Sequence, residues 1–427
     1  MNALVIFTLL AVLMLTGMPI SISLGLTVLT FLFTMTDVPL ESVALKLFTG
    51  IEKFEIMAIP FFILAGNFLT HGGVAKRMIN FATSMVGHWY GGLGLAGVLA
   101  CALFAAVSGS SPATVVAIGS ILLPAMVKAG FPNKFGSGVI ATSCALGILI
   151  PPSIVMVMYS VATNTSVGAL FMAGVIPGLA LAGVLGAVTW YRAKKFDYPR
   201  QPKATWGERW KAFRASVWGL LLIGVVMGGI YTGIFTPTEA AAMSAVYAFI
   251  CAVFIYKDLG LKDVPKVLLN SANMSAMLLY IITNAVLFSF IMTNENIPQA
   301  LADWMLGNGL GIITFLLAVN VILLLAGNFM EPSSIVLIFA PILFPVAIAL
   351  GIHPVHFGIL MVVNMEVGMC HPPVGLNLYV ASGITKMGIT ELTVAVWPWL
   401  LSMLGFLMVV TYWPDLSLWL PRTMGML

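Results

Sequence analysis

The chain has 427 residues, of which 60% are hydrophobic and only 8% charged, and its formal net charge is +4. A soluble domain carries about 25% charged residues, so this composition excludes a soluble globular protein and indicates an all-α, polytopic membrane protein. The small positive charge comes without a basic groove that carries interleaved aromatic residues, which argues against a nucleic-acid partner.

The N-terminal segment predicts a retained membrane span. An apolar run over residues 4–33 is interrupted only at 17–19, and no basic residue precedes it. A cleaved signal peptide would instead start with a positively charged region. Uncharged runs later in the chain are long enough, alone or with their neighbours, to cross about 30 Å of hydrocarbon; they lie at 91–107, 219–235 and 312–326.

A region rich in helix breakers follows in the first half. The sequence at 109–112, Gly-Ser-Ser-Pro, has the composition of a helix start, and the apolar run after it ends in a turn-like sequence at 128–134. A second apolar run then ends at Pro151-Pro152. The first of these two apolar runs is short for a membrane span. We therefore predict a re-entrant hairpin over about 110–150, in which the two runs are the first and second arms, and a break at 151–152.

The middle of the chain is a basic stretch at 191–215, which has eight Lys or Arg residues against two acidic residues. By the positive-inside rule this stretch faces the cytoplasm. Trp206, Trp210 and Phe213 are spaced four and three residues apart, so they predict a short helix at the lipid interface. The stretch separates a first repeat at 1–190 from a second repeat at 216–427.

The helix breakers of the first half return in the second half at a constant offset. Gly147 and Pro151-Pro152 match Gly368 and Pro372-Pro373, an offset of 221 residues (368 − 147). The same offset pairs Pro124 with Pro345, Gly130 with Gly351, and Pro177 with Pro398. A single proline kink in a membrane helix means little. Since breakers fix where helices end, their common register predicts an internal repeat, with a second hairpin at about 331–371 and a break at 372–373.

An odd number of membrane crossings in the first half would give the second half the opposite orientation. The fold class that we predict therefore has two inverted-topology repeats, each with a re-entrant helical hairpin and a broken helix. In folds of this kind the broken ends meet near the midplane, where exposed carbonyls coordinate Na⁺ and helix N-termini attract anions. The sequence thus favours a secondary transporter.

Hydroxyl and carboxylate side chains lie beside both hairpin starts. They are Ser110, Ser111 and Thr114 at the first start, and Glu331, Ser333 and Ser334 at the second. Oxygen ligands of this kind suit a hard cation. Serine and threonine in apolar helices also bond back to the preceding turn, and this structural role is the alternative interpretation.

Two carboxylates lie where hydrocarbon is expected. Glu331 precedes Pro332, and Glu366 lies two residues before Gly368. An intramembrane carboxylate is costly and by default marks an ion, a proton or a charged partner; a helix cap or a buried pair is the alternative for each. His371 is either a proton site or a donor to a freed backbone carbonyl, and the second interpretation is simpler.

Motifs of common enzymes are missing from the sequence. There is no Walker A loop, no HExxH, no GxSxG and no CxxC, so we expect no ATP hydrolysis, no enzymatic activity, and no cofactor besides a coupling ion. The four cysteines lie in apolar surroundings and are interpreted as buried small hydrophobes. A channel or an integral-membrane enzyme, in which the repeat is only architectural, is the alternative from a different class.

Four segments together resemble the large membrane subunit of the tripartite ATP-independent periplasmic (TRAP) transporters, in particular its C4-dicarboxylate branch. They lie at 108–114, 147–153, 235–241 and 364–375. The resemblance covers essentially the whole chain and implies an elevator-type transport domain with two hairpins on a static scaffold, in the inner membrane of a bacterium. It also implies Na⁺-coupled import of a small organic acid, a C4-dicarboxylate, which a periplasmic binding protein delivers. A small four-helix membrane subunit is the second implied protein partner, beside the lipid bilayer.

The resemblance also implies which residues act. Carried over by motif, the cation-binding residues would be Ser110, Ser111, Thr114, Pro151, Glu331, Ser333, Ser334, Gly368 and Pro372. We expect substrate contacts from Asn67, Pro112, Thr236, Thr238, Asn364 and Glu366. The alternative within transport is a Na⁺/H⁺ antiporter, or another ion-coupled transporter of similar inverted-repeat fold, with Glu331 or Glu366 as the proton carrier.

Overall fold

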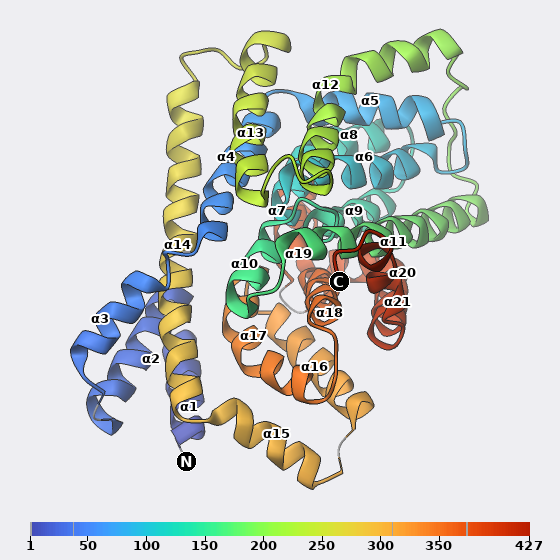
Figure 1. Ribbon diagram of the computed structural model, residues 1–427. Helices are drawn as coiled ribbons and strands as arrows, with labels where there is room; N and C mark the ends of the chain where they lie inside the picture. The colour runs from blue at the N-terminus through green and yellow to red at the C-terminus, as the bar shows by residue number, and fades with distance from the viewer. Residues whose placement is uncertain (1, 37, 310, 373–374) are drawn as a thin grey trace.

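The computed structural model describes residues 2–36, 38–309, 311–372 and 375–427. Over these ranges the chain forms 21 α-helices, with short 3₁₀ and π segments and no strand (Figure 1). Eight helices are long and apolar enough to cross a membrane by length and composition. The prediction of an all-helical, multi-span membrane protein is confirmed.

The helices of the first half end where glycine, proline or polar residues interrupt apolar runs. They are α1 (Asn2–Leu15), α2 (Ile20–Met35), α3 (Leu40–Thr49), η1 (Phe54–Met57), α4 (Ala58–His71), α5 (Val74–Val86), α6 (Gly92–Ser108), α7 (Ser111–Thr114), η2 (Val115–Gly119), α8 (Ser120–Lys128), α9 (Asn133–Ser143), η3 (Cys144–Ile148), α10 (Ile154–Thr163) and α11 (Val167–Lys195).

The second half follows the same rule. Its helices are α12 (Trp206–Tyr231), α13 (Pro237–Ile250), η4 (Cys251–Ile255), α14 (Val264–Asn294), α15 (Ile297–Gly307), α16 (Ile312–Gly327), α17 (Pro332–Ala349), α18 (Pro354–Cys370), α19 (Leu376–Thr385), α20 (Ile389–Tyr412) and α21 (Asp415–Thr423).

Helix boundaries recur between the two halves at the offset found for the breakers. The arms α7 and α17 begin 221 residues apart (332 − 111), and so do α9 and α18 (354 − 133). The copies differ before that point: α14 is one helix of 31 residues, whereas the first half has α3, a linker and η1–α4. Gly50 follows the end of α3, whereas α14 has no glycine or proline after its first turn, so helix propensity explains the difference.

At the centre of the molecule, a helix from each half packs against the other half. The helix after the first break, α10, packs against α17, the first arm of the second hairpin. The helix after the second break, α19, packs against η2 and α9 of the first hairpin. Figure 1 shows α1–α3 and the long α14 together at one side, while α10, α18 and α19, the helices next to the breaks, lie near the middle of the molecule. Both breaks are therefore held in one core that each half helps to build.

Two sequence-based expectations need correction. The first arms are not short: α7, η2 and α8 form a continuous helical run from Ser111 to Lys128, and both this run and α17 are 18 residues long, enough to span by length and composition. The basic connector has no separate interface helix, because Trp206 to Phe213 form the first turns of α12. A capping box of Thr205 and Glu208 starts that helix, so the non-helical connector is only 196–205.

Candidate functional site

A cavity of about 380 Å³ lies between the starts of the two arms and the middle of α14. The first copy contributes Gly109, Ser110 and Pro112, and the second contributes Glu331, Pro332 and Ser333. Methionine and leucine side chains of α14 complete the wall; they are Met274, Met277 and Leu278. The cavity thus joins the two segments that the sequence marked as equivalent.

The first arm starts at a backbone turn that only glycine adopts readily. Gly109 ends α6 with φ +60°, in the left-handed region, and Ser110 is extended before α7 begins. A Cβ on Gly109 would lie 3.0 Å from the backbone oxygen of Pro152. The start of the arm therefore lies directly against the first break, where the Pro151-Pro152 bond is cis.

The first break touches the arm through backbone as well. A Cβ on Gly147 would lie 2.6 Å from the backbone nitrogen of Ser111, closer than side chains pack. The Ser111 hydroxyl donates to the Ala145 carbonyl at 3.1 Å, so it bridges α7 and η3. Carbonyl and hydroxyl oxygens consequently converge at this point, which is the chemistry that the sequence predicted there.

The remaining hydroxyls of the first copy form a local network. Thr114 Oγ1 donates to the Ser110 carbonyl at 2.8 Å and lies 3.0 Å from Ser108 Oγ. The bond back to the preceding turn, the structural alternative, therefore applies to Thr114. Ser110 points to the cavity, and within the described residues its hydroxyl forms no hydrogen bond of its own.

In the second copy, Glu331 is the extended residue before α17, as Ser110 is before α7. Its Oε1 accepts a long hydrogen bond of 3.4 Å from Ser334 Oγ, and no Lys, Arg or His lies within ion-pair distance of it in the described part of the chain. The glycine of the second break has a different neighbour, because a Cβ on Gly368 would lie 3.0 Å from the Cα of Gly327, at the end of α16. One carboxylate thus lines a cavity that is otherwise neutral.

The second break is described only in part. α18 ends at Cys370 and α19 begins at Leu376; Pro372 lies between them, whereas Pro373 is outside the described residues. His371 Nδ1 lies 3.3 Å from the side-chain oxygen of Asn328. The expected partner of His371 was a freed carbonyl, and its partner is instead a side chain at the end of α16.

Three of the expected substrate residues lie away from this cavity. Asn67 donates to Ser271 Oγ at 2.8 Å and so ties α4 to α14. Thr236 and Thr238 line a different cavity of about 550 Å³, where Thr236 caps α13 and Thr238 donates to the Phe54 carbonyl at 3.2 Å. Of the six expected residues, only Pro112 lies on the wall between the arms.

Asn364 is a fully buried part of a side-chain ladder between three helices. Its Nδ2 donates to Asn320 Oδ1 at 2.9 Å, and Asn320 Nδ2 donates to Thr411 Oγ1 at 2.9 Å. The ladder joins α18 to α16 and α20. These hydrogen bonds connect the three helices, while Asn364 Oδ1 is buried without a hydrogen-bond partner among the described residues.

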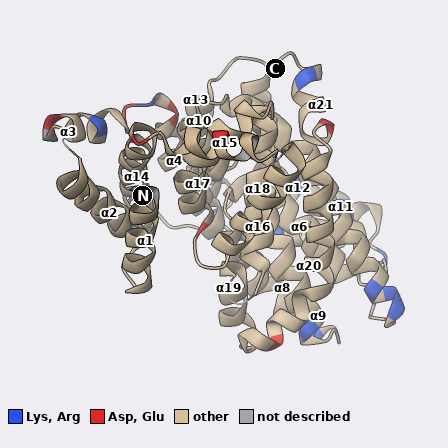
Figure 2. Cartoon of the chain, turned by 90° about the horizontal axis from the view of Figure 1, so that it is seen from below, with Lys and Arg blue, Asp and Glu red and all other residues tan. Residues whose placement is uncertain are grey.

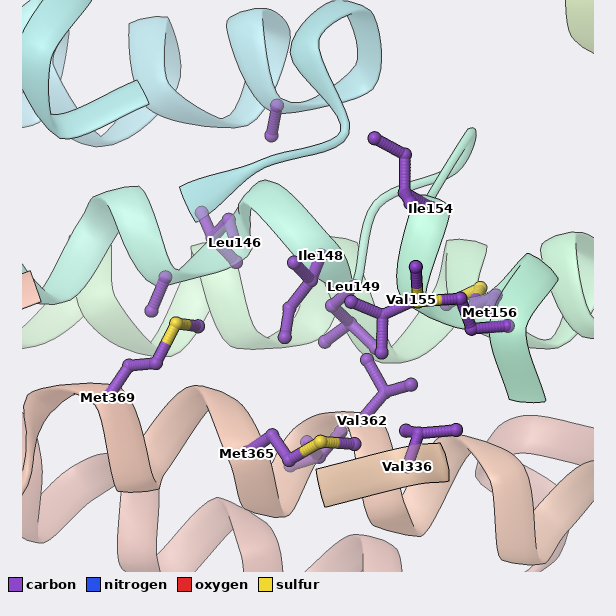
Figure 3. Packing of buried hydrophobic residues seen from close by; sticks show 14 of the residues in the cluster. Leu146, Ile148, Leu149, Ile154, Val155, Met156, Val336, Val362, Met365 and Met369 are labelled. Atoms are coloured by element: carbon purple, nitrogen blue, oxygen red, sulfur yellow. The ribbon is translucent and has the colours of Figure 1, made fainter. Parts of the chain in front are cut away.

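Glu366 lies on α18, is completely buried, and its side chain is directed at the other half of the chain. The backbone amides of Ile148 and Leu149, in the first break, lie against its carboxylate, although neither oxygen forms a hydrogen bond of normal geometry within the described residues. Figure 3 shows Ile148 and Leu149 facing the helix that carries Met365. The carboxylate of the second half therefore lies beside the break of the first.

Sequence reasoning missed the wall that α14 provides. Met274, Met277 and Leu278 are ordinary apolar residues in a continuous helix, so no local signal marked them. It also missed Lys53, whose Nζ donates to the Val161 carbonyl at 2.5 Å and to Asn164 Oδ1 at 2.7 Å. Lys53 ties the linker before α4 to the end of α10, a contact that depends on tertiary structure alone.

Comparisons with known proteins agree on one family. The family model described as "Tripartite ATP-independent periplasmic transporter, DctM component" matches residues 7–416. The C4-dicarboxylate TRAP transporter large permease protein DctM of Rhodobacter capsulatus is 76% identical, with all of both chains covered. The protein of that name from Pseudomonas aeruginosa is 53% identical, over 95% of each chain.

A longer relative and a solved structure are also similar to this chain. The isethionate TRAP transporter permease protein DctMQ of Oleidesulfovibrio alaskensis is 41% identical over 97% of this chain, which corresponds to 65% of that relative. Among solved structures, the YdaH transporter of Alcanivorax borkumensis is similar with a TM-score of 0.55 and 15% identity, and the match covers 84% of this chain and 86% of that one. At that identity the likeness concerns the fold alone.

Proposed function

Because the chain belongs to the DctM component family of the tripartite ATP-independent periplasmic transporters, we propose that it is the large permease of an importer of C4-dicarboxylates, driven by a Na⁺ gradient. Membership makes it a transporter component and not an enzyme. The dicarboxylate substrate rests on three relatives of that printed function, which are between 51% and 76% identical over nearly their full lengths.

We propose two protein partners, a periplasmic binding protein that delivers the substrate and a small four-helix membrane subunit. The family description, tripartite and periplasmic, supports both. The longer relative whose printed name joins M and Q supports the membrane partner, since this chain corresponds to 65% of it. The proposed location is the bacterial inner membrane, with the basic stretch 191–215 in the cytoplasm because of its positive charge.

The single observation that carries the proposed mechanism is the cavity shared by Ser110 and Glu331. In the first proposed cation site, Ser110, Ser111 and Thr114 would act with the backbone at Pro151. In the second, the ligands would be Glu331, Ser333 and Ser334 with the backbone at Gly368 and Pro372. Hydroxyl, carbonyl and carboxylate oxygens fit a hard monovalent ion, and the start of each arm adds a helix N-terminus that favours the substrate carboxylates.

The arrangement of helices further supports two inverted repeats and an elevator-type movement. The repeated segments α7–η3 and α17–α18 would be the two re-entrant hairpins, which move together because α10 and α19 each pack on the opposite copy. α14 would belong to the static scaffold, since it is continuous and packs on α2, α3 and α4. The cavity would then lie where the moving part slides along the scaffold.

Uptake into proteoliposomes tests the proposed function. With the small subunit and the binding protein present, we expect saturable uptake of labelled succinate that needs an inward Na⁺ gradient and that a pH gradient alone does not drive. Movement of labelled Na⁺ driven by a pH gradient, without uptake of succinate, would instead support the Na⁺/H⁺ antiporter alternative. A Na⁺-independent leak conductance would support a channel.

A further inference from the structure

The positive charge of the protein is concentrated at one place, the junction of α11 and α12. The stretch 191–215, called here the basic elbow, contains eight Lys or Arg residues and two acidic residues, a net charge of +6. The rest of the chain therefore has a net charge of −2 (+4 − 6). Figure 2 shows the corresponding blue patch beyond the end of α11.

None of the eight cations of the elbow forms an ion pair with an acidic residue in the described structure. One of the two acids, Glu208, is already engaged, because its carboxylate accepts from the backbone and side chain of Thr205. Arg192 and Arg209 are half-buried and lie over aromatic rings, whereas the four lysines of the elbow are exposed. The charge of the elbow is thus available to an external anion.

Aromatic side chains accompany these cations on the surface. Trp206 is 82% exposed, Trp210 65% and Tyr191 61%. Exposed tryptophan and tyrosine at the end of an apolar helix are typical of the membrane–water interface. Both flanking helices, α11 and α12, are among those long and apolar enough to span, so the elbow starts at the level where hydrocarbon gives way to headgroups.

From this combination we propose that the basic elbow binds the headgroups of anionic phospholipids. Unpaired lysine and arginine next to a membrane surface attract anionic lipid, and the exposed indoles place the backbone at headgroup depth. A soluble anion would gain nothing from these aromatic rings or from the adjoining spans, so the lipid is the occupant that accounts for all three features. The proposal does not depend on the transported substrate or on the coupling ion.

The second connector offers a matched contrast. At 257–266 three lysines alternate with Asp258 and Asp263, so its net charge is only +1, against +6 for the basic elbow. If charge density rather than the mere presence of lysines matters, lysines of this connector should contribute little to lipid binding.

The test uses the purified full-length protein in detergent, with dioleoylphosphatidylglycerol and dioleoylphosphatidylcholine as probes. Native mass spectrometry counts the retained lipids, and thermal unfolding with added lipid measures stabilisation. In the test variant the exposed lysines of the elbow become glutamine: Lys194→Gln, Lys195→Gln, Lys203→Gln and Lys211→Gln. In the control variant the same number of exposed lysines changes elsewhere: Lys128→Gln, Lys257→Gln, Lys262→Gln and Lys266→Gln.

We expect the wild-type protein and the control to retain phosphatidylglycerol in preference to phosphatidylcholine, and the test variant to lose this preference by about tenfold or more. Millimolar inorganic phosphate should not displace the lipid. An unchanged preference in the test variant, or an equal loss in the control, would overturn the proposal. Displacement by phosphate alone would also overturn it, in favour of a simple anion site. If the quadruple variant does not fold, the double variant Lys194→Gln with Lys195→Gln should show a smaller loss in the same direction.

Discussion

Replacing Glu331 with glutamine should strongly reduce Na⁺-dependent uptake while the protein remains folded. Glutamine keeps the size of the side chain and its contact with Ser334, but it removes the only carboxylate that lines the cavity between the arms among the residues that the structure describes. A contact to a charged group is worth about 1.5–3 kcal/mol, so the Na⁺ concentration for half-maximal uptake should rise by about 10- to 100-fold. The measurement is initial uptake of succinate across a series of Na⁺ concentrations.

Two further variants make this result interpretable. Ser110→Ala changes the equivalent position of the first copy, and because a neutral hydroxyl is the weaker ligand, it should have a smaller effect of the same kind. Glu41→Gln, which removes an exposed carboxylate on α3, should leave uptake unchanged. If Glu331→Gln and Ser110→Ala both transported with the Na⁺ dependence of the wild type, the proposed cation sites would be wrong.

A methyl group on Gly147 should abolish transport and lower thermal stability. The added Cβ would lie 2.6 Å from the nitrogen of Ser111 and 2.7 Å from the carbonyl carbon of Ser110. Both atoms belong to the backbone, so the first break must move away from the start of the arm. Overpacking of this kind lowers the free energy of unfolding by about 1–3 kcal/mol. It would also separate the Ser111 hydroxyl from the Ala145 carbonyl. Uptake and the midpoint of thermal unfolding measure the two effects.

The matched control for this substitution lies in α11. Gly183 has no atom within 4 Å of an added Cβ, and it is in the middle of a helix. Gly183→Ala should therefore stabilise the protein, by about 0.5–1 kcal/mol, and leave uptake intact. Wild-type uptake by Gly147→Ala would mean that the close contact between break and arm is not required.

Much of the fold could be predicted because breakers act locally. Proline and glycine disfavour continued helix, and the offset read from Gly147 and Gly368 matches the recurrence of helix starts at α7 and α17 and at α9 and α18. The expectation that every repeated breaker ends a helix is wrong, because Pro124, Pro177, Pro345 and Pro398 lie inside helices. Helix-start residues are recognisable in the same way, so the sequence also indicated Ser110 and Glu331, each of which directly precedes the first helix of a hairpin. Family membership, which four short segments indicated, is confirmed by the comparisons.

The parts that sequence reasoning missed depend on which helices meet. Thr236 and Thr238 look like residues of a site, yet α13 carries them to a separate cavity. Glu366 was assigned to substrate, but the packing of α18 against η3 places it beside the amides of Ile148 and Leu149. Such neighbours are set by tertiary packing, for which a single sequence gives no periodic or spacing signal.

The arm lengths and the connector illustrate a second limit. The length of the apolar run suggested a first arm too short for a membrane span, but the helical run passes through a π segment at 115–119 and through Pro124 and reaches Lys128. Similarly, the aromatic spacing after Thr205 is compatible with a short surface helix and with the first turns of a long one. Only the uninterrupted packing of α12 against α5 and α13 decides between them.

We expect Na⁺ and the organic anion to bind together in the cavity between the starts of the two arms. Ala113 lies on its wall, so the rate at which a thiol reagent modifies Ala113→Cys reports occupancy directly; the four native cysteines are buried, and the wild-type protein gives the background. We predict that Na⁺ and succinate together slow this modification severalfold more than either alone, while modification of the exposed control Leu261→Cys is unaffected. An unchanged rate at Ala113→Cys, in a variant that still transports, would contradict the account.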